Sequence, residues 1–145
     1  MEKPSMGNLK DKVNAEIENI EETLKELPDS PKLPYLTILE LAGVATLLHN
    51  YYNGIENILK QILKHQNIKI PQGSSWHKDL LNLSERYNII SLETKQNLIE
   101  YLAFRHFFNH SYALDLYSTK MEPLVENVHD NFNHFKREIT TKLQS

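Results

Sequence analysis

Residues 36–65, LTILELAGVATLLHNYYNGIENILKQILKH, form the longest stretch of the chain with helical periodicity. Apolar side chains are distributed around most of the circumference of this helix. Such a helix is surrounded by other helices, so we expect Leu36 to about His65 to form the centre of the fold. Gly43 and Gly54 each weaken the helix by roughly 1 kcal/mol relative to alanine, and we expect them to mark close helix crossings.

The region before the central helix has an amphipathic pattern of its own. Apolar residues from Leu9 to Leu27 recur every three or four positions opposite a charged face, which predicts a helix. Pro28 ends this helix, and Pro28, Pro31 and Pro34 together predict a rigid connection to the central helix.

Two helix starts are indicated after the central helix. Ser74 or Ser75 is expected to cap a short helix that continues to about Tyr87. Ser91 is expected to cap a longer helix that starts at Leu92. These signals predict one short helix followed by one long helix.

The end of the chain carries a fifth helical pattern. Residues 119–122, TKME, have the spacing of a capping box before Pro123, from which the last helix is expected to run. Elsewhere in the sequence no stretch alternates with period two between turn signals. We therefore predict an all-α fold, an up-and-down helical bundle of four long helices plus one short helix, in a single domain over residues 1–145.

Composition limits the classes of function. Hydrophobic residues make up 40% and charged residues 24% of the chain, as in globular proteins, and the absence of cysteine fits a cytoplasmic protein. The longest uncharged stretch, Leu41 to Ile55, is shorter than a membrane span, so we expect no membrane association. With a net charge of -3, attraction of RNA requires a local site or one assembled from two chains.

The segment 104–112, FRHFFNHSY, has the clearest chemical character, because an arginine, two histidines and a tyrosine interrupt an aromatic stretch. A guanidinium in apolar surroundings is costly unless an anion pairs with it, and a phosphate is one such anion. Imidazole exchanges protons near neutral pH. His110 is therefore a candidate base for the 2′-hydroxyl of RNA, and Arg105 a candidate clamp for the phosphate, in cleavage without a metal.

The helical geometry of this segment separates the two candidates. On an undistorted helix Arg105 and His110 point about 140° apart. Either the helix is distorted or broken near Asn109, or two copies of the chain complete one site. We expect a homodimer, because two-fold interfaces are the commonest arrangement.

Two other interpretations of the segment remain open. In a structural one, Arg105 pairs with Asp115 or Glu100, and both histidines are polar residues of a packed helix. Alternatively, His106 and His110 lie four residues apart and could hold zinc from one helix face. A third ligand at a recognisable spacing is missing from the sequence, so we predict no metal and no cofactor.

Three elements of the sequence resemble a known family. Arg105-x4-His110-x-Tyr112 resembles the Arg-x4-His-x-Tyr signature of the HepT toxins in the HEPN superfamily, which are helical-bundle ribonucleases. Residues 51–58, YYNGIENI, are similar to the second-helix pattern of that family. Residues 76–81, WHKDLL, are similar to the Trp-His-x-x-Leu-Leu of a HepT-like branch. The order of the three elements matches as well.

The resemblance implies a metal-independent endoribonuclease toxin that acts on an RNA substrate as a homodimer. Arg105 and His110 would be catalytic, and His106 and Asn109 would have supporting roles. Asn109 stands at a position where the closest relatives are expected to carry a basic residue. The implied partner is a nucleotidyltransferase antitoxin that attaches AMP to Tyr112 and blocks the cleft. The alternative is a non-catalytic bundle that binds a nucleotidyltransferase or nucleotide.

For the other polar and aromatic residues, structural or solvent-exposed positions are weighed against functional ones. Glu56 is expected on a helix surface rather than as an acceptor for the arginine. His77 and Lys78 fit solvated positions and phosphate contacts equally well, and Tyr101 and Tyr117 are expected to pack within the bundle. No role is assigned to the remaining histidines outside the segment, which are His49, His65, His129 and His134.

Overall fold

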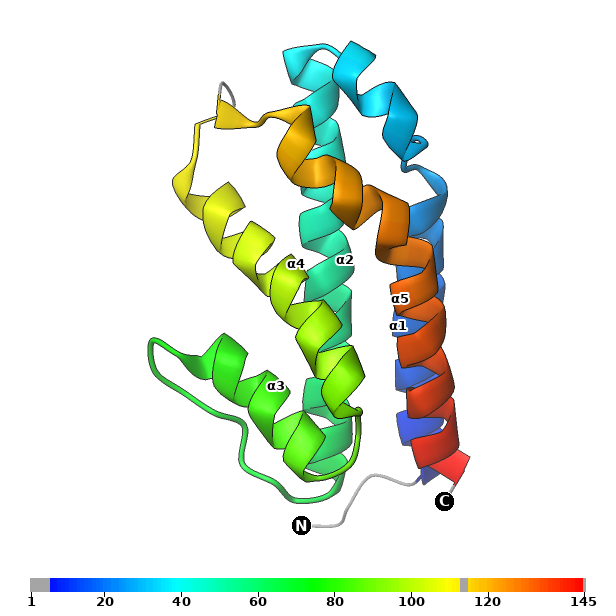
Figure 1. The fold of residues 1–145 in the computed structure, drawn as a ribbon. Helices are drawn as coiled ribbons and strands as arrows, with labels where there is room; N and C mark the ends of the chain where they lie inside the picture. Colours follow the sequence, from blue (N-terminus) through cyan, green and yellow to red (C-terminus); the bar gives the residue numbers. More distant parts are fainter. Residues whose placement is uncertain (1–5, 113–114, 145) are drawn as a thin grey trace.

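A computed structural model describes residues 6–112 and 115–144. These residues form α1 (Met6–Lys25), a 3-10 helix η1 (Ser30–Tyr35), α2 (Ile38–His65), α3 (Trp76–Arg86), α4 (Leu92–His110) and α5 (Ser118–Gln144), and they include no strand. The four long helices alternate in direction along the bundle, and α3 is the short one (Figure 1). The predicted fold class is therefore confirmed.

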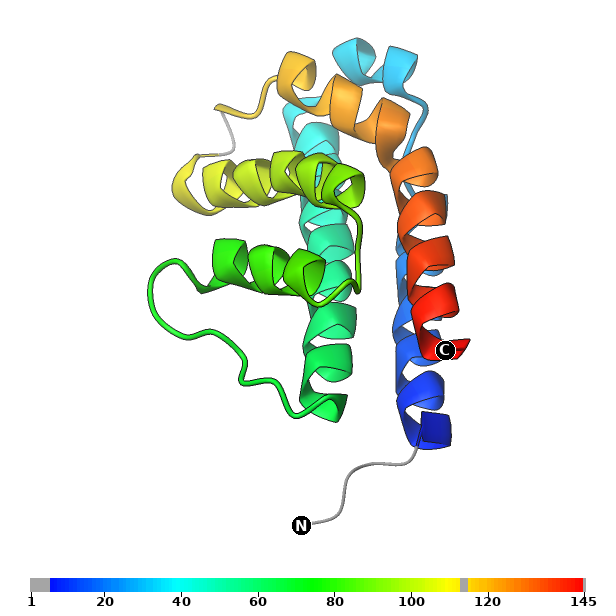
Figure 2. The same cartoon turned by 60° about the horizontal axis from the view of Figure 1, so that its bottom comes forward.

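Helix α2 is the centre of the bundle, as its apolar pattern predicts. It contacts α1, α3, α4 and α5. Helices α3 and α4 lie side by side on one flank of α2, whereas α1 and the C-terminal part of α5 lie on the other (Figures 1 and 2). Tyr51, Tyr52 and Ile55 in the middle of α2 are completely buried. The segment 104–112 at the end of α4 thus lies beside a buried central helix.

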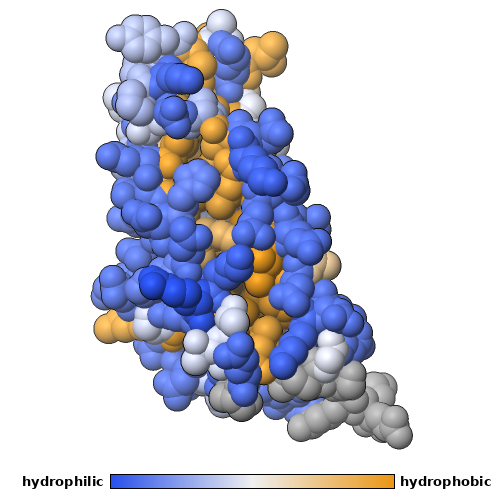
Figure 3. Space-filling model, turned by 90° about the vertical axis from the view of Figure 1, so that its right-hand side faces the viewer, coloured by the Kyte–Doolittle hydropathy of each residue, from blue (hydrophilic) through white to orange (hydrophobic). Residues whose placement is uncertain are grey.

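The faces of α1 and α5 that point away from the core are hydrophilic. A narrow strip of hydrophobic side chains runs lengthwise between them, where the two helices meet (Figure 3). Each helix therefore buries one apolar stripe and exposes a charged one, as an amphipathic pattern requires. Within the described ranges, no helix has the length and apolar character needed to cross a membrane.

Two of the predicted helix starts are capped by side chains. At the start of α2, the Thr37 hydroxyl accepts a hydrogen bond from the Glu40 amide at 3.1 Å, and the Glu40 carboxylate accepts one from the Thr37 amide at 2.9 Å. At the start of α4, the Ser91 hydroxyl accepts a hydrogen bond from the Thr94 amide at 3.1 Å. Both caps satisfy amide groups that the helix itself leaves unpaired.

Two other predictions about helix starts need correction. Ser75 precedes α3, but its hydroxyl donates to the Asp79 carboxylate at 3.0 Å and accepts no backbone hydrogen bond. Helix α5 begins at Ser118, so residues 119–122 lie inside it and Pro123 does not mark its start. Helix α5 packs against η1, and such tertiary contacts outweigh the local signal for a break at the proline.

The two glycines of α2 have different surroundings. A Cβ atom on Gly54 would lie 2.6 Å from Cγ1 of Ile20 in α1, so the close crossing expected there is confirmed. A Cβ atom on Gly43 would meet nothing within 4 Å, and the same expectation is wrong at that position. Of these two glycines, Gly54 is therefore the one whose missing side chain leaves room for α1 against α2.

Candidate functional site

Arg105 is half-buried on α4 and faces α2. Its Nε atom donates a hydrogen bond to Oδ1 of Asn53 at 3.2 Å. Among the residues that the structure describes, no carboxylate lies within ion-pair distance of the guanidinium, and this includes Glu100 and Asp115. The interpretation in which Arg105 forms a structural ion pair with one of these acids is therefore wrong, and its charge is held by a neutral amide.

Asn53 also contacts a histidine one turn earlier on α2. Its Nδ2 atom lies 3.4 Å from Nδ1 of His49, and the His49 ring packs against the ring of Phe108 with centroids 5.2 Å apart. Burial lowers the pKa of His49, and the positive charge of Arg105 lowers it further, while the carboxylate of Glu56 opposes this. His49, Asn53 and Arg105 thus form a polar chain between α2 and α4.

Glu56 lies one turn after Asn53, on the same flank of α2. It is 3% exposed, so the expectation of a surface glutamate is wrong. Its Oε2 atom lies 2.7 Å from Nδ1 of His77 on α3, which makes His77 a partner of Glu56 rather than a solvated residue. Burial raises the pKa of Tyr52, and the charge of Glu56 acts in the same direction. Lys78, by contrast, is exposed.

The remaining polar residues of the segment lie at the exposed end of α4. His106, Asn109 and His110 are all exposed, and the rings of the two histidines are 4.5 Å apart between centroids. Helix α4 runs without interruption past Asn109 to His110, so the break near Asn109, one of the two alternatives drawn from the sequence, is absent. Because the helix is regular, His110 points to a different side from Arg105, and no hydrogen bond or ring contact within the described residues joins them.

The zinc interpretation finds no additional ligand. No group of three His, Cys, Asp or Glu side chains in the described residues is arranged to hold a metal ion. His106 and His110 therefore form a pair of neighbouring imidazoles on a solvent-facing helix surface.

Tyr112 follows the end of α4, and 81% of it is exposed. Its backbone amide donates to the carboxylate of Asp115 at 3.3 Å, and the Asp115 amide donates to the Tyr112 carbonyl at 2.9 Å. These backbone contacts fix the position of the residue and leave the phenol accessible. Asp115, which the sequence offered as a partner for Arg105, is used here instead.

The two other tyrosines considered in the sequence have opposite environments. Tyr101 packs within the bundle as expected, and its hydroxyl donates to the Leu124 carbonyl at 2.7 Å. Burial raises the pKa of Tyr101 to about 12. Tyr117 is 61% exposed, so the expectation that it packs in the bundle is wrong.

Sequence reasoning missed the roles of His49 and Asn53. A signal for them is present, because His49, Asn53 and Glu56 follow the spacing i, i+4, i+7, which places three polar side chains on one face of a helix that is otherwise largely apolar. The sequence does not say which neighbouring helix meets that face. The structure places α3 and α4 there.

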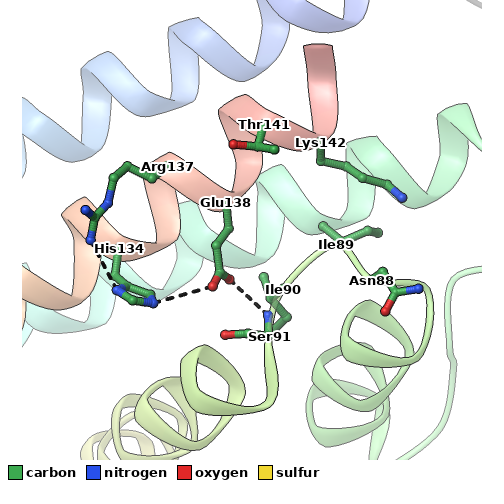
Figure 4. A pocket seen from close by; sticks show the side chains of 9 residues that line it. All are labelled: Asn88, Ile89, Ile90, Ser91, His134, Arg137, Glu138, Thr141 and Lys142. Carbon is green, nitrogen blue, oxygen red and sulfur yellow. Dashed lines mark hydrogen bonds and ion pairs between the residues drawn. The ribbon is translucent and has the colours of Figure 1, made fainter. Parts of the chain in front are cut away.

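A pocket of about 590 Å³ lies at the opposite end of α4. In Figure 4, His134 lies between Arg137 and Glu138, and Glu138 also accepts a hydrogen bond from the Ser91 amide at 2.9 Å. These polar groups of the pocket are engaged with one another. The lining contains none of the site residues indicated by the sequence, and comprises Asn88, Ile89, Ile90, Ser91, His134, Arg137, Glu138, Thr141 and Lys142.

An all-α up-and-down bundle whose α4 ends in Arg-x4-His, with an exposed tyrosine two residues after the histidine, has the fold and motif of the HEPN class. The sequence model of a family described as HepT-like protein matches residues 43–144. The match covers α3, α4 and α5 completely and most of α2, and the chain belongs to this HepT-like family of the HEPN superfamily. Family membership indicates a protein of the HEPN toxin type. No curated protein and no solved structure matches the chain.

Proposed function

We propose that the protein is a metal-independent endoribonuclease toxin in which Arg105 and His110 are catalytic. The observation that supports this most strongly is the environment of Arg105, whose half-buried guanidinium is bonded to a neutral amide and forms no ion pair with a carboxylate of the described residues. Desolvated positive charge of this kind is stabilised by an anion, and a phosphodiester can accept two hydrogen bonds from one guanidinium.

The proposed reaction is attack of the RNA 2′-oxygen on the adjacent phosphorus. A neutral His110 takes the 2′-hydroxyl proton, the new P–O bond closes a 2′,3′-cyclic phosphate, and the bond to the 5′-oxygen breaks as that oxygen takes a proton from water, to which the His110 imidazolium returns its own proton. Arg105 neutralises the negative charge that grows on the phosphate oxygens. His106 and Asn109 flank the site and support RNA binding.

A homodimer is proposed because one chain does not bring the two catalytic groups together. His110 is exposed and points away from Arg105 on a regular helix, so a second copy must supply the missing group. A mixture of Arg105→Ala and His110→Ala chains tests this. If each site uses groups from both copies, mixed dimers regain part of the activity that each variant alone lacks. Absence of any recovery, with mixed dimers present, would exclude the shared site.

The ribonuclease activity is tested with purified protein in EDTA. We expect RNA fragments that end in 2′,3′-cyclic phosphate, and we expect Arg105→Ala and His110→Ala to abolish their formation. Arg86→Ala and His129→Ala are matched controls, because both residues are exposed on other helices. Cleavage that requires a metal, or that survives both active-site substitutions, would contradict the proposal. A stable complex with a nucleotidyltransferase without any cleavage would favour a non-catalytic binding bundle.

We also propose that a nucleotidyltransferase antitoxin inhibits the toxin by attaching AMP to Tyr112. The exposed phenol is accessible to such an enzyme, and the adenylate would bring a bulky anion to the segment that carries Arg105. After incubation with the partner and ATP, the intact mass should rise by adenylate increments. Tyr112→Phe should prevent the increase, whereas Tyr117→Phe, at another exposed tyrosine, should not. An unchanged adduct in Tyr112→Phe would place the modification elsewhere.

A further inference from the structure

We propose that Asn53 is the positioning residue for Arg105, and that a neutral His49 sets the orientation of the Asn53 amide. This inference rests on the proposed ribonuclease function, in which Arg105 holds the phosphate. It adds two residues of α2 that touch no RNA but decide where the guanidinium points.

The orientation of the amide follows from the chemistry of its two neighbours. A guanidinium has only donors, so the atom of Asn53 that faces Arg105 Nε must be the carbonyl oxygen. The amide nitrogen then faces Nδ1 of His49, and because an amide nitrogen only donates, Nδ1 must accept. An imidazole nitrogen accepts only when it carries no proton, so His49 is neutral with its proton on Nε2.

The surroundings of His49 favour this neutral form. The positive charge of Arg105 on α4 opposes a second cation nearby, and the ring packs against Phe108 of the same helix. Among the described residues, the buried Nε2 of His49 has no hydrogen-bond partner, so none of them offers an acceptor that would stabilise an imidazolium. In the described part of the chain, Glu56 on α2 is the charged group that favours protonation, and its carboxylate is bonded to His77.

Protonation of His49 would undo the arrangement. Nδ1 would then become a donor and could no longer accept from Asn53, so the amide would have to rotate and present its nitrogen to Arg105. Two donors would face each other, and the guanidinium would lose its hydrogen bond to Asn53. Acid should therefore weaken the site through His49 as well as through the proposed base, His110.

The hydrogen bond is tested directly by following the Nε–H protons in protein with ¹⁵N-labelled arginine. The chain has three arginines, and Arg86, which is exposed, serves as the internal reference for intrinsic exchange with water. At pH 7.5 the Arg105 proton should exchange more slowly than the Arg86 proton. Asn53→Ala should remove this protection. Equal exchange rates in wild type and Asn53→Ala would overturn the inference.

Two substitutions at His49 distinguish its role as a hydrogen-bond acceptor from the effect of its protonation. Gln at position 49 offers an oxygen that accepts from Asn53 at every pH, whereas Leu offers none. His49→Gln should keep the Arg105 proton protected between pH 5 and 7.5, and His49→Leu should lose protection at both ends of this range. The wild type should change from protected to unprotected as the pH falls. If the Gln and Leu variants behave alike, His49 does not orient the amide. Dispersed spectra of each variant verify that it is folded.

The activity assay then connects positioning with catalysis. Asn53→Ala should lower kcat/KM for RNA roughly 10- to 100-fold, the cost of misplacing a catalytic group by about 1 Å. His49→Gln should retain most activity and lose the acid dependence that His49 contributes. Lost protection with unchanged kcat/KM would overturn the positioning role. If the Arg105 proton is protected as expected but the wild type cleaves no RNA, the proposed function is rejected. The inference that Asn53 and His49 hold Arg105 in place then stands.

Discussion

Nδ1 of His77 lies 2.7 Å from Oε2 of Glu56, although the two residues are 21 positions apart and belong to different helices. An ionised carboxylate only accepts hydrogen bonds, so Nδ1 must donate. Glu56 is buried, and His77 is mostly covered, which shields the pair from water. The pair fastens α3 to α2 directly beside the face of α2 that holds Arg105.

Removal of His77 should destabilise the protein strongly, because it leaves the Glu56 carboxylate buried without this partner. We expect His77→Ala to lower the free energy of unfolding by about 3 kcal/mol in urea denaturation. His134→Ala is the matched control, since His134 pairs with Glu138 on the partly exposed surface of one helix, and it should cost less than about 1 kcal/mol. A similar decrease in the free energy of unfolding in both variants would show that the buried pair contributes no more to stability than the surface pair.

The two glycines of α2 should respond to alanine with opposite signs. Gly54→Ala places a methyl group against Ile20, and a shift of this packed contact costs about 1–3 kcal/mol, more than the roughly 1 kcal/mol gained in helix propensity. Gly43→Ala enters open space and should stabilise the protein by up to about 1 kcal/mol. Thermal unfolding of the two variants measures the difference, and a stabilising Gly54→Ala would contradict the close crossing.

Strong alkali should unfold the protein through its buried tyrosines. Burial raises the pKa of Tyr101 to about 12, and burial also raises the pKa of Tyr51. Their neutral forms are favoured in the folded state, so this stability is complete below about pH 10, the unfolded value, and is lost as the pH rises through the folded values. Tyrosinate absorbance and circular dichroism should therefore change together above pH 10. Full ionisation of all seven tyrosines near pH 10 in folded protein would contradict the buried environment.

Mild acid should destabilise the protein through His49. The folded state lowers the pKa of His49, mainly by burial, so the unfolded chain binds a proton near pH 6.5 while the folded chain does not. Stability is thus complete above about pH 6.5 and falls as the pH decreases toward the folded pKa. Urea denaturation of wild type and His49→Gln between pH 7.5 and 5 should show a steeper decline for the wild type. Parallel curves would mean that His49 titrates as it does in the unfolded chain.

The helices were predictable from local signals wherever tertiary contacts agreed with them. The apolar pattern of α2 and the cap residues Thr37 and Ser91 act over one or two turns, so sequence reasoning can detect them. The start of α5 was not predictable, because α5 packs against η1, which is distant in the sequence. The prediction that Tyr117 packs within the bundle was wrong for the same reason, since the position of Tyr117 depends on how α5 begins.

The candidate site divides in the same way. The order of Arg105, His110 and Tyr112 along α4, and the angle between the first two, follow from the sequence, because a regular helix sets side-chain directions by a constant rotation per residue. The partners of these residues do not follow. Asn53 is 52 residues from Arg105, and Glu56 meets His77 across two helices, so both pairs depend on how α3 and α4 cross α2.

The sequence by itself determined an all-α bundle, its central helix and the chemical segment at the end of α4, because helical period and side-chain chemistry are local properties. Only the tertiary structure decided that Arg105 is held by an amide instead of an acid, and that Glu56 is buried against a histidine. Those outcomes depend on which faces of distant helices are in contact, and hydrophobic packing of the whole bundle determines these contacts.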